Sequence, residues 1–384
     1  MMAIVDYIWN FWKNLRSDDD FFDRLSHRWT ALTLLIFALV VAGEESIMKN
    51  AIICWVPGEF EDSHKNYVDN YCWIQNTYYI PFNERIPDSS LPRQHVSYYQ
   101  WVPIFLLIQA LLFHLPSVFW RSLAPRTGID VHLIVTSMNG LHSVDQEERK
   151  AVTASTAEHL SRYFRINQRR LDTARNKFFA KKWCACFCDR HSNYITRVYF
   201  FIKFLYAVNA IGQFFLLNAF LGSAYHLYGF DVISDLTKNL DWTSSGRFPR
   251  VTLCDLNIRR LGGNIHRYTV QCLLPINLFN EKIYIFIWFL LVFVSAATVF
   301  GFMVWANLLF KSDRMQFVKK QLELTGTLNE GDAENLKQFI DKYLRLDGVF
   351  VLKLISRNTN SFAVTDLTKA LWEKFKLEKT IKRT

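Results

Sequence analysis

Residues 98–120 read YYQWVPIFLLIQALLFHLPSVFW, a run of 23 residues with no acidic or basic side chain other than His114. As an α-helix the run is about 34 Å long, because each residue adds about 1.5 Å, and a bilayer core is about 30 Å thick. The run can therefore cross a membrane. Pro103, which lacks an amide hydrogen, predicts either the first turn of this helix or a kink that could act as a hinge.

Three more stretches of the 384-residue chain are nearly free of charge, at 29–43, 204–221 and 283–310. The first is short for a bilayer core, so its span must include flanking residues. Four spans exclude a soluble protein. Asn209 and Gln213 lie four residues apart on one face of the third span, where we expect hydrogen bonds to a neighbouring helix; pore lining is the alternative.

Lysine and arginine, 45 in all, give the chain a net charge of +10 and are spread unevenly between its loops. Alternate segments carry 33 on one side of the membrane and 11 on the other, and the positive-inside rule makes the richer side cytoplasmic. Lys203, at the cytoplasmic end of the third span, is expected to extend its ammonium group to the lipid headgroups. The expected order is a cytoplasmic N-terminal segment (1–28), a first span (29–48), an outer loop (49–97), a second span (98–120), a cytoplasmic loop (121–197), a third span (198–227), a second outer loop (228–282), a fourth span (283–310) and a cytoplasmic C-terminal region (311–384).

The cysteines follow the same division. Disulfides persist outside the cell, whereas cytosolic thiols stay reduced. We therefore expect two disulfides among the four outer cysteines, for which the sequence allows three pairings. The three inner cysteines have one-residue spacings that do not match zinc-binding patterns, so we predict reduced thiols open to palmitoylation and no metal site. The outer residues are Cys54, Cys72, Cys254 and Cys272, and the inner ones are Cys184, Cys186 and Cys188.

The loops contain enough apolar residues to fold. The first outer loop is rich in aromatic and acidic residues, which favours a compact cap over a disordered linker. The second contains short β-prone runs at 250–253 and 268–273, and helical patterns occupy 147–179 and 333–346 on the cytoplasmic side. The sequence thus predicts a mostly α membrane protein, a four-helix transmembrane bundle with a small disulfide-linked α/β extracellular cap and a helical cytoplasmic dome.

Five short segments resemble signature segments of the innexins, the gap-junction proteins of invertebrates. The resemblance extends to the topology of the whole chain, with four spans and two cysteines in each outer loop. YYQWV at the start of the second span is its most specific part, since pannexins share the cysteine pattern and connexins share it loosely. The segments are DDDFFDRL at 18–25, CWVP at 54–57, NYCW at 70–73, TYYIP at 77–81 and YYQWVP at 98–103.

This resemblance implies a large-pore channel. Eight identical or related subunits would form a ring, or hemichannel, and two hemichannels would dock through their outer loops so that ions and small metabolites pass between cells. It also implies disulfides between the loops, Cys54 with Cys272 and Cys72 with Cys254. Membrane lipids are expected partners, whereas no cofactor and no nucleic acid is expected.

The resemblance also suggests which residues face the pore. In innexins the N-terminal segment folds into the pore mouth as a funnel, which would place Ala3, Ile4, Asp6 and Tyr7 beside permeating ions. An amphipathic helix on the membrane surface is the alternative. Glu44 and Glu45, just outside the first span, would form a ring of carboxylates that favours cations, or would simply be solvated residues at a helix end.

Other functions receive less support. The chain contains no phosphate-binding glycine loop, no HExxH and no GxSxG motif, so enzymatic chemistry is not predicted. Two alternatives stay open. One is a pannexin-like hemichannel that acts in a single membrane and forms no junction, and the other is a four-span adhesion protein that forms no channel. Neither outer loop contains an Asn-x-Ser/Thr sequon, which favours docking modestly because a glycan there would obstruct it.

Overall fold

The computed structural model describes most of the chain, and two compact units account for it. Unit 1 combines residues 1–25, 115–207 and 297–384, and unit 2 combines 26–114 and 208–296. The described residues are 19–47, 52–81, 84–86, 95–139, 146–175, 193–222, 225–238, 247–259, 262–328 and 330–381.

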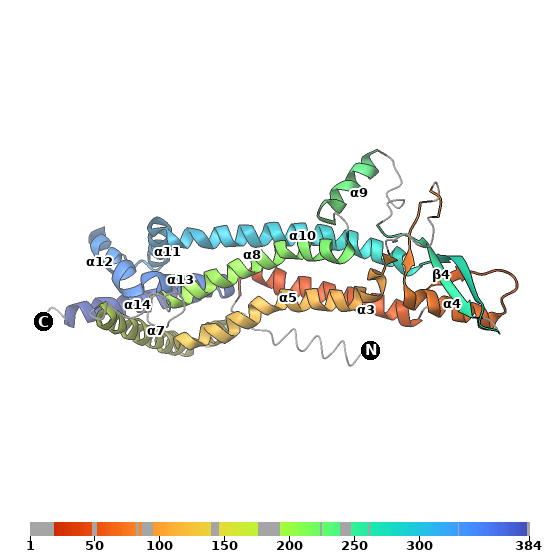
Figure 1. Cartoon of the computed structure of the whole chain (residues 1–384). Coiled ribbons are helices and arrows are strands. Elements are labelled where there is room, and N and C mark those ends of the chain that lie inside the picture. The colour runs from red at the N-terminus through yellow and green to blue at the C-terminus, as the bar shows by residue number, and fades with distance from the viewer. Residues whose placement is uncertain are drawn as a thin grey trace. The chain divides into compact units, whose positions relative to one another are not determined.

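Within the described residues, four helices are long and apolar enough to cross a membrane, as the sequence predicts (Figure 1). The first joins α2 (Phe21–Arg24), a π-helix (Leu25–Thr30) and α3 (Ala31–Ile47). The second joins a 3-10 helix (Tyr98–Trp101) to α5 (Val102–Leu123). The third is α8 (Tyr194–Leu221), and the fourth is α10 (Ile276–Ala306), followed by a 3-10 turn (Asn307–Leu309).

All four helices extend beyond the charge-free stretches of the sequence, and the third begins at Tyr194, before the stretch at 204–221. The first begins at Phe21, not near residue 29, because Asp20 caps it and Asp23 pairs with Lys203. The fourth begins at Ile276, ahead of the expected 283, and includes Glu281, whose carboxylate pairs with Arg250. Paired charges can lie inside a helix that continues into a membrane, so counting uncharged residues underestimates its length.

Unit 2 contains a five-stranded antiparallel sheet in the order β1-β5-β4-β2-β3. Strands β4 (Val251–Arg259) and β5 (Ile265–Leu273) form its long hairpin, with nine paired positions. Strand β5 includes the predicted run 268–273, and β4 begins one residue inside the predicted run 250–253 and extends beyond it. The hairpin turn contains Gly262 and Gly263, both with positive φ, a conformation that other residues adopt at a cost. The shorter strands are β1 (Ile53–Trp55), β2 (Thr77–Tyr78) and β3 (His95–Val96).

Helices complete unit 2. Helix α4 (Asp62–Gln75) begins at a capping box between Glu61 and His64, and α9 (Tyr228–Thr237) follows a 3-10 turn (Tyr225–Leu227). The expected hydrogen bonding between spans is confirmed for Gln213, whose Oε1 accepts from the Gln109 amide over 3.0 Å. The Gln213 amide in turn donates over 3.0 Å to Oδ1 of Asn209 in its own helix. These buried amides hold the second span against the third.

Unit 1 is helical, which confirms the predicted dome. The predicted helix at 147–179 is α7 (Gln146–Arg175), as far as the description extends. The pattern at 333–346 divides into α12 (Ala333–Gln338), a π-helix (Phe339–Leu344) and the start of α13 (Arg345–Asn358), where Arg345 has a φ of 57°. Most residues in the middle of α13 are buried in the apolar core. The other helices are α6 (Val131–Asn139), α11 (Lys311–Leu324) and α14 (Ser361–Ile381), with 3-10 turns at Ala124–Thr127 and Glu330–Asp332.

Candidate functional site

Two disulfides join the outer loops in unit 2. Cys54 of β1 is bonded to Cys272 of β5, its direct partner in the strand register, and Cys72 of α4 is bonded to Cys254 of β4. These are the pairs that the resemblance implies. The bonds connect residues 218 and 182 positions apart, so each loop is covalently held by the other. We call the disulfide-linked assembly of α4 and β1 to β5 the cap.

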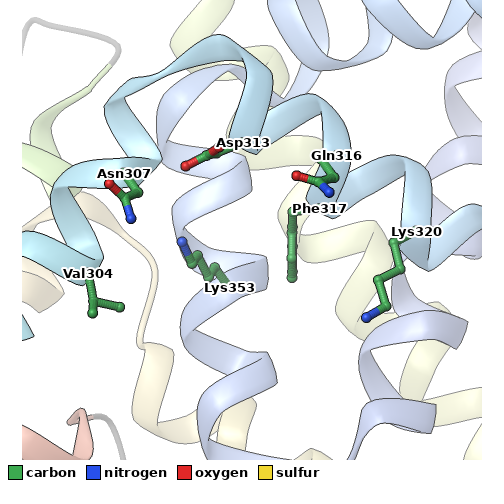
Figure 2. Close-up of a pocket in the computed structure, with 7 residues that line it drawn as sticks. All are labelled: Val304, Asn307, Asp313, Gln316, Phe317, Lys320 and Lys353. Carbon is green, nitrogen blue, oxygen red and sulfur yellow. The ribbon is translucent and has the colours of Figure 1, made fainter.

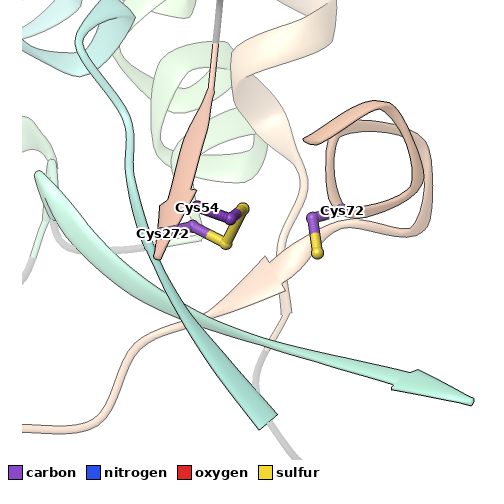
Figure 3. A group of neighbouring side chains, drawn as sticks. All are labelled: Cys54, Cys72 and Cys272. Atoms are coloured by element: carbon purple, nitrogen blue, oxygen red, sulfur yellow. A yellow bond between two sulfur atoms is a disulfide. The ribbon is translucent and has the colours of Figure 1, made fainter. Parts of the chain in front are cut away.

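The cysteines of the cap lie close together without forming a metal site. The sulfur atoms of Cys54, Cys72 and Cys272 all lie within 4.8 Å of one another, and Figure 3 shows the Cys54–Cys272 bond with Cys72 beside it. All three sulfurs are already used in disulfides, and a metal requires the free thiolate. The Cys54–Cys272 bond joins two strands of the sheet, and Cys72 joins α4 to the sheet through Cys254.

A buried carboxylate adds a second link between α4 and the sheet. Asp69 of α4 accepts a hydrogen bond from the backbone amide of Cys54 over 2.8 Å. Burial raises the pKa of Asp69, and the hydrogen bond from Cys54 opposes that rise. Thr252, Cys254 and Leu256 alternate along the buried face of β4, as expected for a strand with one covered face.

The YYQWVP segment attaches the second span to the cap. Tyr98 donates to the carbonyl of Arg247 over 3.2 Å, and both Tyr99 and Gln100 donate to the carbonyl of Trp73. This carbonyl belongs to the last turn of α4, where a helix has no intrahelical partner for its oxygens. The segment thus supplies the C-terminal cap of α4, and the Tyr99 and Trp73 rings pack with centroids 4.8 Å apart.

The rest of this predicted motif begins the helix. Trp101 ends the 3-10 turn, and Val102 and Pro103 are the first two residues of α5. At the second helical position the missing amide hydrogen of proline breaks no bond within α5, so Pro103 lies in the first turn of this helix. The proline inside α5 is Pro116, which the sequence interpretation did not consider.

The fourth span is attached to the cap through polar side chains. Arg250 donates to Glu281 Oε2 over 2.8 Å, and the Asn277 amide donates to the carbonyl of Pro249 over 2.7 Å. The carboxylate of Glu281 is buried, so its charge requires this partner. The second and fourth spans therefore both begin with side chains that hold the cap.

Apolar side chains remain exposed on the cap. Trp55, beside the Cys54–Cys272 bond, is 81% exposed, and Tyr67, Ile74 and Ile265 are also largely exposed. Large exposed apolar groups near a rigid, cross-linked scaffold are typical of surfaces that bind another protein.

Unit 1 contains a buried ion cluster that the sequence interpretation missed. The Lys203 ammonium of α8 lies 2.9 Å from Asp23 Oδ1 and 3.2 Å from Asp20 Oδ2, and the Lys203 side chain is 2% exposed. The prediction that Lys203 extends to the headgroups is therefore wrong. It fails because two carboxylates of the first span supply the partners that water and headgroups would have provided.

Aromatic residues surround this cluster. The Trp305 indole donates to Asp20 Oδ2 over 2.8 Å, and the Tyr199 hydroxyl donates to Asp23 Oδ2 over 3.2 Å. A Cβ atom on Gly301 would approach the Phe22 side chain to 2.9 Å, so glycine is required where α10 meets α2. We call Asp20, Asp23, Lys203, Tyr199 and Trp305 the anchor cluster. Two sequence features could have predicted this cluster: the aspartates of the DDDFFDRL segment, and Lys203, which the sequence places at the same membrane depth.

The predicted pore residues are not placed by the structure. The four funnel residues and the inner cysteine triplet lie outside the described residues. The two glutamates belong to the last turn of α3, but their side chains also lie outside the described part. These residues are Ala3, Ile4, Asp6 and Tyr7, Cys184, Cys186 and Cys188, and Glu44 and Glu45.

These features define a four-span membrane protein with cross-linked outer loops and a helical cytoplasmic unit, the architecture of large-pore channel subunits. The innexin family model matches residues 19–375. Innexin unc-9 of Caenorhabditis elegans is 36% identical, with 93% of this chain and 92% of that protein covered. Innexin-3 of C. elegans is 37% identical (93% and 83%), and innexin-19 of Caenorhabditis briggsae is 34% identical (94% and 88%). The chain belongs to the innexin family and is a gap-junction channel subunit of the plasma membrane.

Proposed function

We propose that the chain assembles with identical or related subunits into an octameric hemichannel that docks, cap to cap, with a hemichannel of the adjacent cell. The cross-linked cap carries this proposal, because docking needs a surface that keeps its shape without support from the membrane. Its exposed Trp55 and Ile265 offer apolar contacts of the kind that dominate protein interfaces. The chain would act as a conduit for ions and small metabolites and not as an enzyme.

Paired-cell recording tests docking against its alternatives. Two cells that express the chain should show junctional current, and a soluble dye should pass between them. A pannexin-like hemichannel would give current across single membranes only, and a four-span adhesion protein would give neither. Trp55→Ser should reduce junctional current and leave single-membrane current unchanged, because only docking uses this side chain. Tyr194→Phe, in unit 1, is the control for general effects of altering an aromatic residue.

The N-terminal segment is proposed to line the pore mouth. Residues 1–15 are apolar and aromatic and precede the first span, and Ala3, Ile4, Asp6 and Tyr7 are the candidates to face ions. Asp20 and Asp23, in the anchor cluster, fix the chain a few residues after this segment, which supports a defined position for it. Deletion of residues 2–12 should change the single-channel conductance. Unchanged conductance would favour the surface helix.

The acidic pair at the end of α3 is proposed to concentrate cations at the outer entrance. In a ring, Glu44 and Glu45 of every subunit would contribute carboxylates to one circle. Lys49 follows closely and would weaken this field. Reversing both charges, Glu44→Lys with Glu45→Lys, should shift the reversal potential toward anion permeability in asymmetric salt. An unchanged reversal potential would identify both residues as solvated helix-end residues.

A further inference from the structure

A hollow of about 380 Å³ lies in unit 1 where α10 ends and α11 begins. Its walls come from the end of the fourth span, from α11 and from α13, and Figure 2 shows their side chains around a common space. The Lys353 side chain points toward Asn307 and Asp313, and Lys320 extends from α11. We call this hollow the basic pocket. Its lining residues are Val304, Asn307, Asp313, Gln316, Phe317, Lys320 and Lys353.

The pocket holds more positive than negative charge. Lys320 and Lys353 face one carboxylate, Asp313, and in the described part of the chain neither ammonium lies within 4.0 Å of a carboxylate oxygen. Burial lowers the pKa of Lys353, nearby Arg357 lowers it further, and Asp313 opposes the shift. A half-buried ammonium with incomplete pairing gains from an anion that enters the pocket.

The pocket adjoins surface that suits lipid. Val304 and Asn307 belong to the fourth candidate span, Ile276–Leu309. Met303, Leu309 and Phe310, next to them in sequence, are all more than half exposed, Phe310 to 63%. Exposed apolar residues at the end of a membrane helix are covered by acyl chains, and a basic pocket at the cytoplasmic end of such a helix is suited to a lipid headgroup. A ligand seated here can therefore keep its tails in the bilayer.

We propose that the basic pocket binds the headgroup of an anionic aminophospholipid of the phosphatidylserine type. Such a headgroup has a phosphate, a carboxylate and one ammonium group, and the pocket offers two ammonium groups and one carboxylate. The lysines would bind the two anionic groups, Asp313 would bind the amine, and the amides of Asn307 and Gln316 would complete the hydrogen bonding. The proposal uses the predicted cytoplasmic position of this end of α10, where anionic lipids are concentrated.

Binding at Lys353 would act close to the anchor cluster. The Lys353 ammonium lies 5.7 Å from the centre of the Trp305 ring, and the Trp305 indole donates to Asp20. The Trp305 side chain thus lies between the proposed lipid ligand Lys353 and Asp20, which caps the first span. The bound lipid is placed where it can stabilise the cytoplasmic end of this span.

The test measures lipid binding to the purified full-length channel in phosphatidylcholine nanodiscs. Dioctanoyl phosphatidylserine is titrated by native mass spectrometry, in parallel with dioctanoyl phosphatidylglycerol and soluble glycerophosphoserine. We expect phosphatidylserine to bind at least about fivefold more tightly than phosphatidylglycerol. Glycerophosphoserine should bind much more weakly than phosphatidylserine. Equal binding of the two lipids would overturn the role of the amine. If glycerophosphoserine bound as tightly as phosphatidylserine, the proposal that the ligand is a lipid would be overturned.

Variants separate the pocket from general surface charge. Lys320→Ala and Lys353→Met should each weaken phosphatidylserine binding about tenfold, which corresponds to about 1.4 kcal/mol. Lys319→Ala is the matched control, because Lys319 is the neighbouring exposed lysine, does not line the pocket and pairs with Glu323. Equal losses in Lys319→Ala and Lys320→Ala would overturn the proposal.

Asp313→Asn should change the selectivity between the two lipids, an effect that loss of folding cannot produce. It should abolish the preference for phosphatidylserine over phosphatidylglycerol while binding of phosphatidylglycerol becomes tighter, because the only carboxylate lining the pocket in the described chain is removed. A retained preference would show that Asp313 does not bind the amine and would overturn that assignment.

Discussion

The extracellular cap and the cytoplasmic unit are held together by different interactions. In the cap, two disulfides and a hairpin of nine paired positions connect segments that are distant in sequence. In unit 1, a buried apolar core spans several helices, and Lys203 pairs with two buried aspartates in the anchor cluster. One region depends on covalent bonds, and the other on packing and buried charge.

The difference follows the chemistry of the two compartments. The cap is small and cannot bury a large core, and it lies where disulfides persist, so cross-links replace packing. The cytosol reduces disulfides, but unit 1 has enough helices to bury whole side chains such as Trp305 and Phe350. Perturbations should therefore act on one region and leave the other intact.

The largest effect is expected from removing the cation of the anchor cluster. Lys203→Met leaves Asp20 and Asp23 buried without their positive partner, which costs about 3–5 kcal/mol. Hydrogen exchange should rise in α2 and in the cytoplasmic half of α8, and the melting temperature of the purified channel should fall. Exchange in β4 and β5 should stay unchanged.

A second substitution checks that the effect comes from uncompensated charge. Adding Asp23→Asn to Lys203→Met removes one of the two stranded carboxylates and should restore part of the lost stability. Lys319→Met serves as the control for loss of an exposed lysine and should cost little. If Lys203→Met behaved like Lys319→Met, the anchor cluster would not stabilise unit 1.

The next effect concerns the cap. Replacing Cys72 and Cys254 together by serine removes the link between α4 and β4, which closes 182 residues, and should cost about 2–4 kcal/mol. Exchange should increase in α4 and β4, and junctional current should fall sharply. Unit 1 should keep its exchange pattern.

The pairing itself is open to direct measurement. Peptide mapping under non-reducing conditions should recover Cys54 joined to Cys272 and Cys72 joined to Cys254. In the double serine variant only the first pair should remain. Bonds within one loop would contradict the cap described here, as would equal exchange increases in the cap and in unit 1.

A smaller, pH-dependent effect is expected where α13 meets the start of α8. Asp347 Oδ1 accepts hydrogen bonds from the Thr196 amide over 3.1 Å and from the Thr196 hydroxyl over 2.6 Å. Burial raises the pKa of Asp347 from its usual 3.8 to about 6, although the bonds from Thr196 oppose this rise. The folded state thus favours the protonated acid, and its contribution to stability is fully present below pH 3.8 and lost as the pH rises through about 6.

The shift corresponds to at most about 3 kcal/mol, and about half of it falls in the range accessible to the purified channel. Between pH 5 and 7 the melting temperature should fall in the native chain. Asp347→Asn keeps an acceptor oxygen for Thr196 but cannot ionise, so its melting temperature should vary less over the same range. Identical slopes for both proteins would contradict the assignment to Asp347.

The same contrast explains what could be predicted from the sequence. The four spans follow from composition, and the sides of the membrane are predicted from charge, because both act over whole segments. The cysteine pairs needed the family resemblance, because spacing alone allows three pairings. The hydrogen bond between Gln109 and Gln213 could be expected because a polar group inside a span needs a partner.

Features that depend on contacts between distant segments could not be predicted in this way. The sequence of the third span alone predicts headgroup contact for Lys203, because it gives no sign of the aspartates that meet this lysine. The first span begins early for the same reason, since Asp20 and Asp23 pair with a lysine that is distant in sequence. The pairing of Asp347 with Thr196 joins residues 151 positions apart, and no local pattern marks it.

The smallest effect tests how firmly the YYQWVP segment holds the cap. Gln100→Ala removes one of two donors to the carbonyl of Trp73, and Tyr99 still donates to that oxygen over 3.3 Å. Because the carbonyl keeps a partner, the cost should be only about 0.5–1.5 kcal/mol, seen as faster exchange in the last turn of α4. Gln100→Glu should cost more, since its carboxylate faces an oxygen and has no hydrogen to donate. If both variants exchanged like the native chain, the Gln100 donor would contribute nothing to the attachment, and the hydrogen bonds of Tyr98 and Tyr99 with the packing of the Tyr99 and Trp73 rings would hold the second span to the cap.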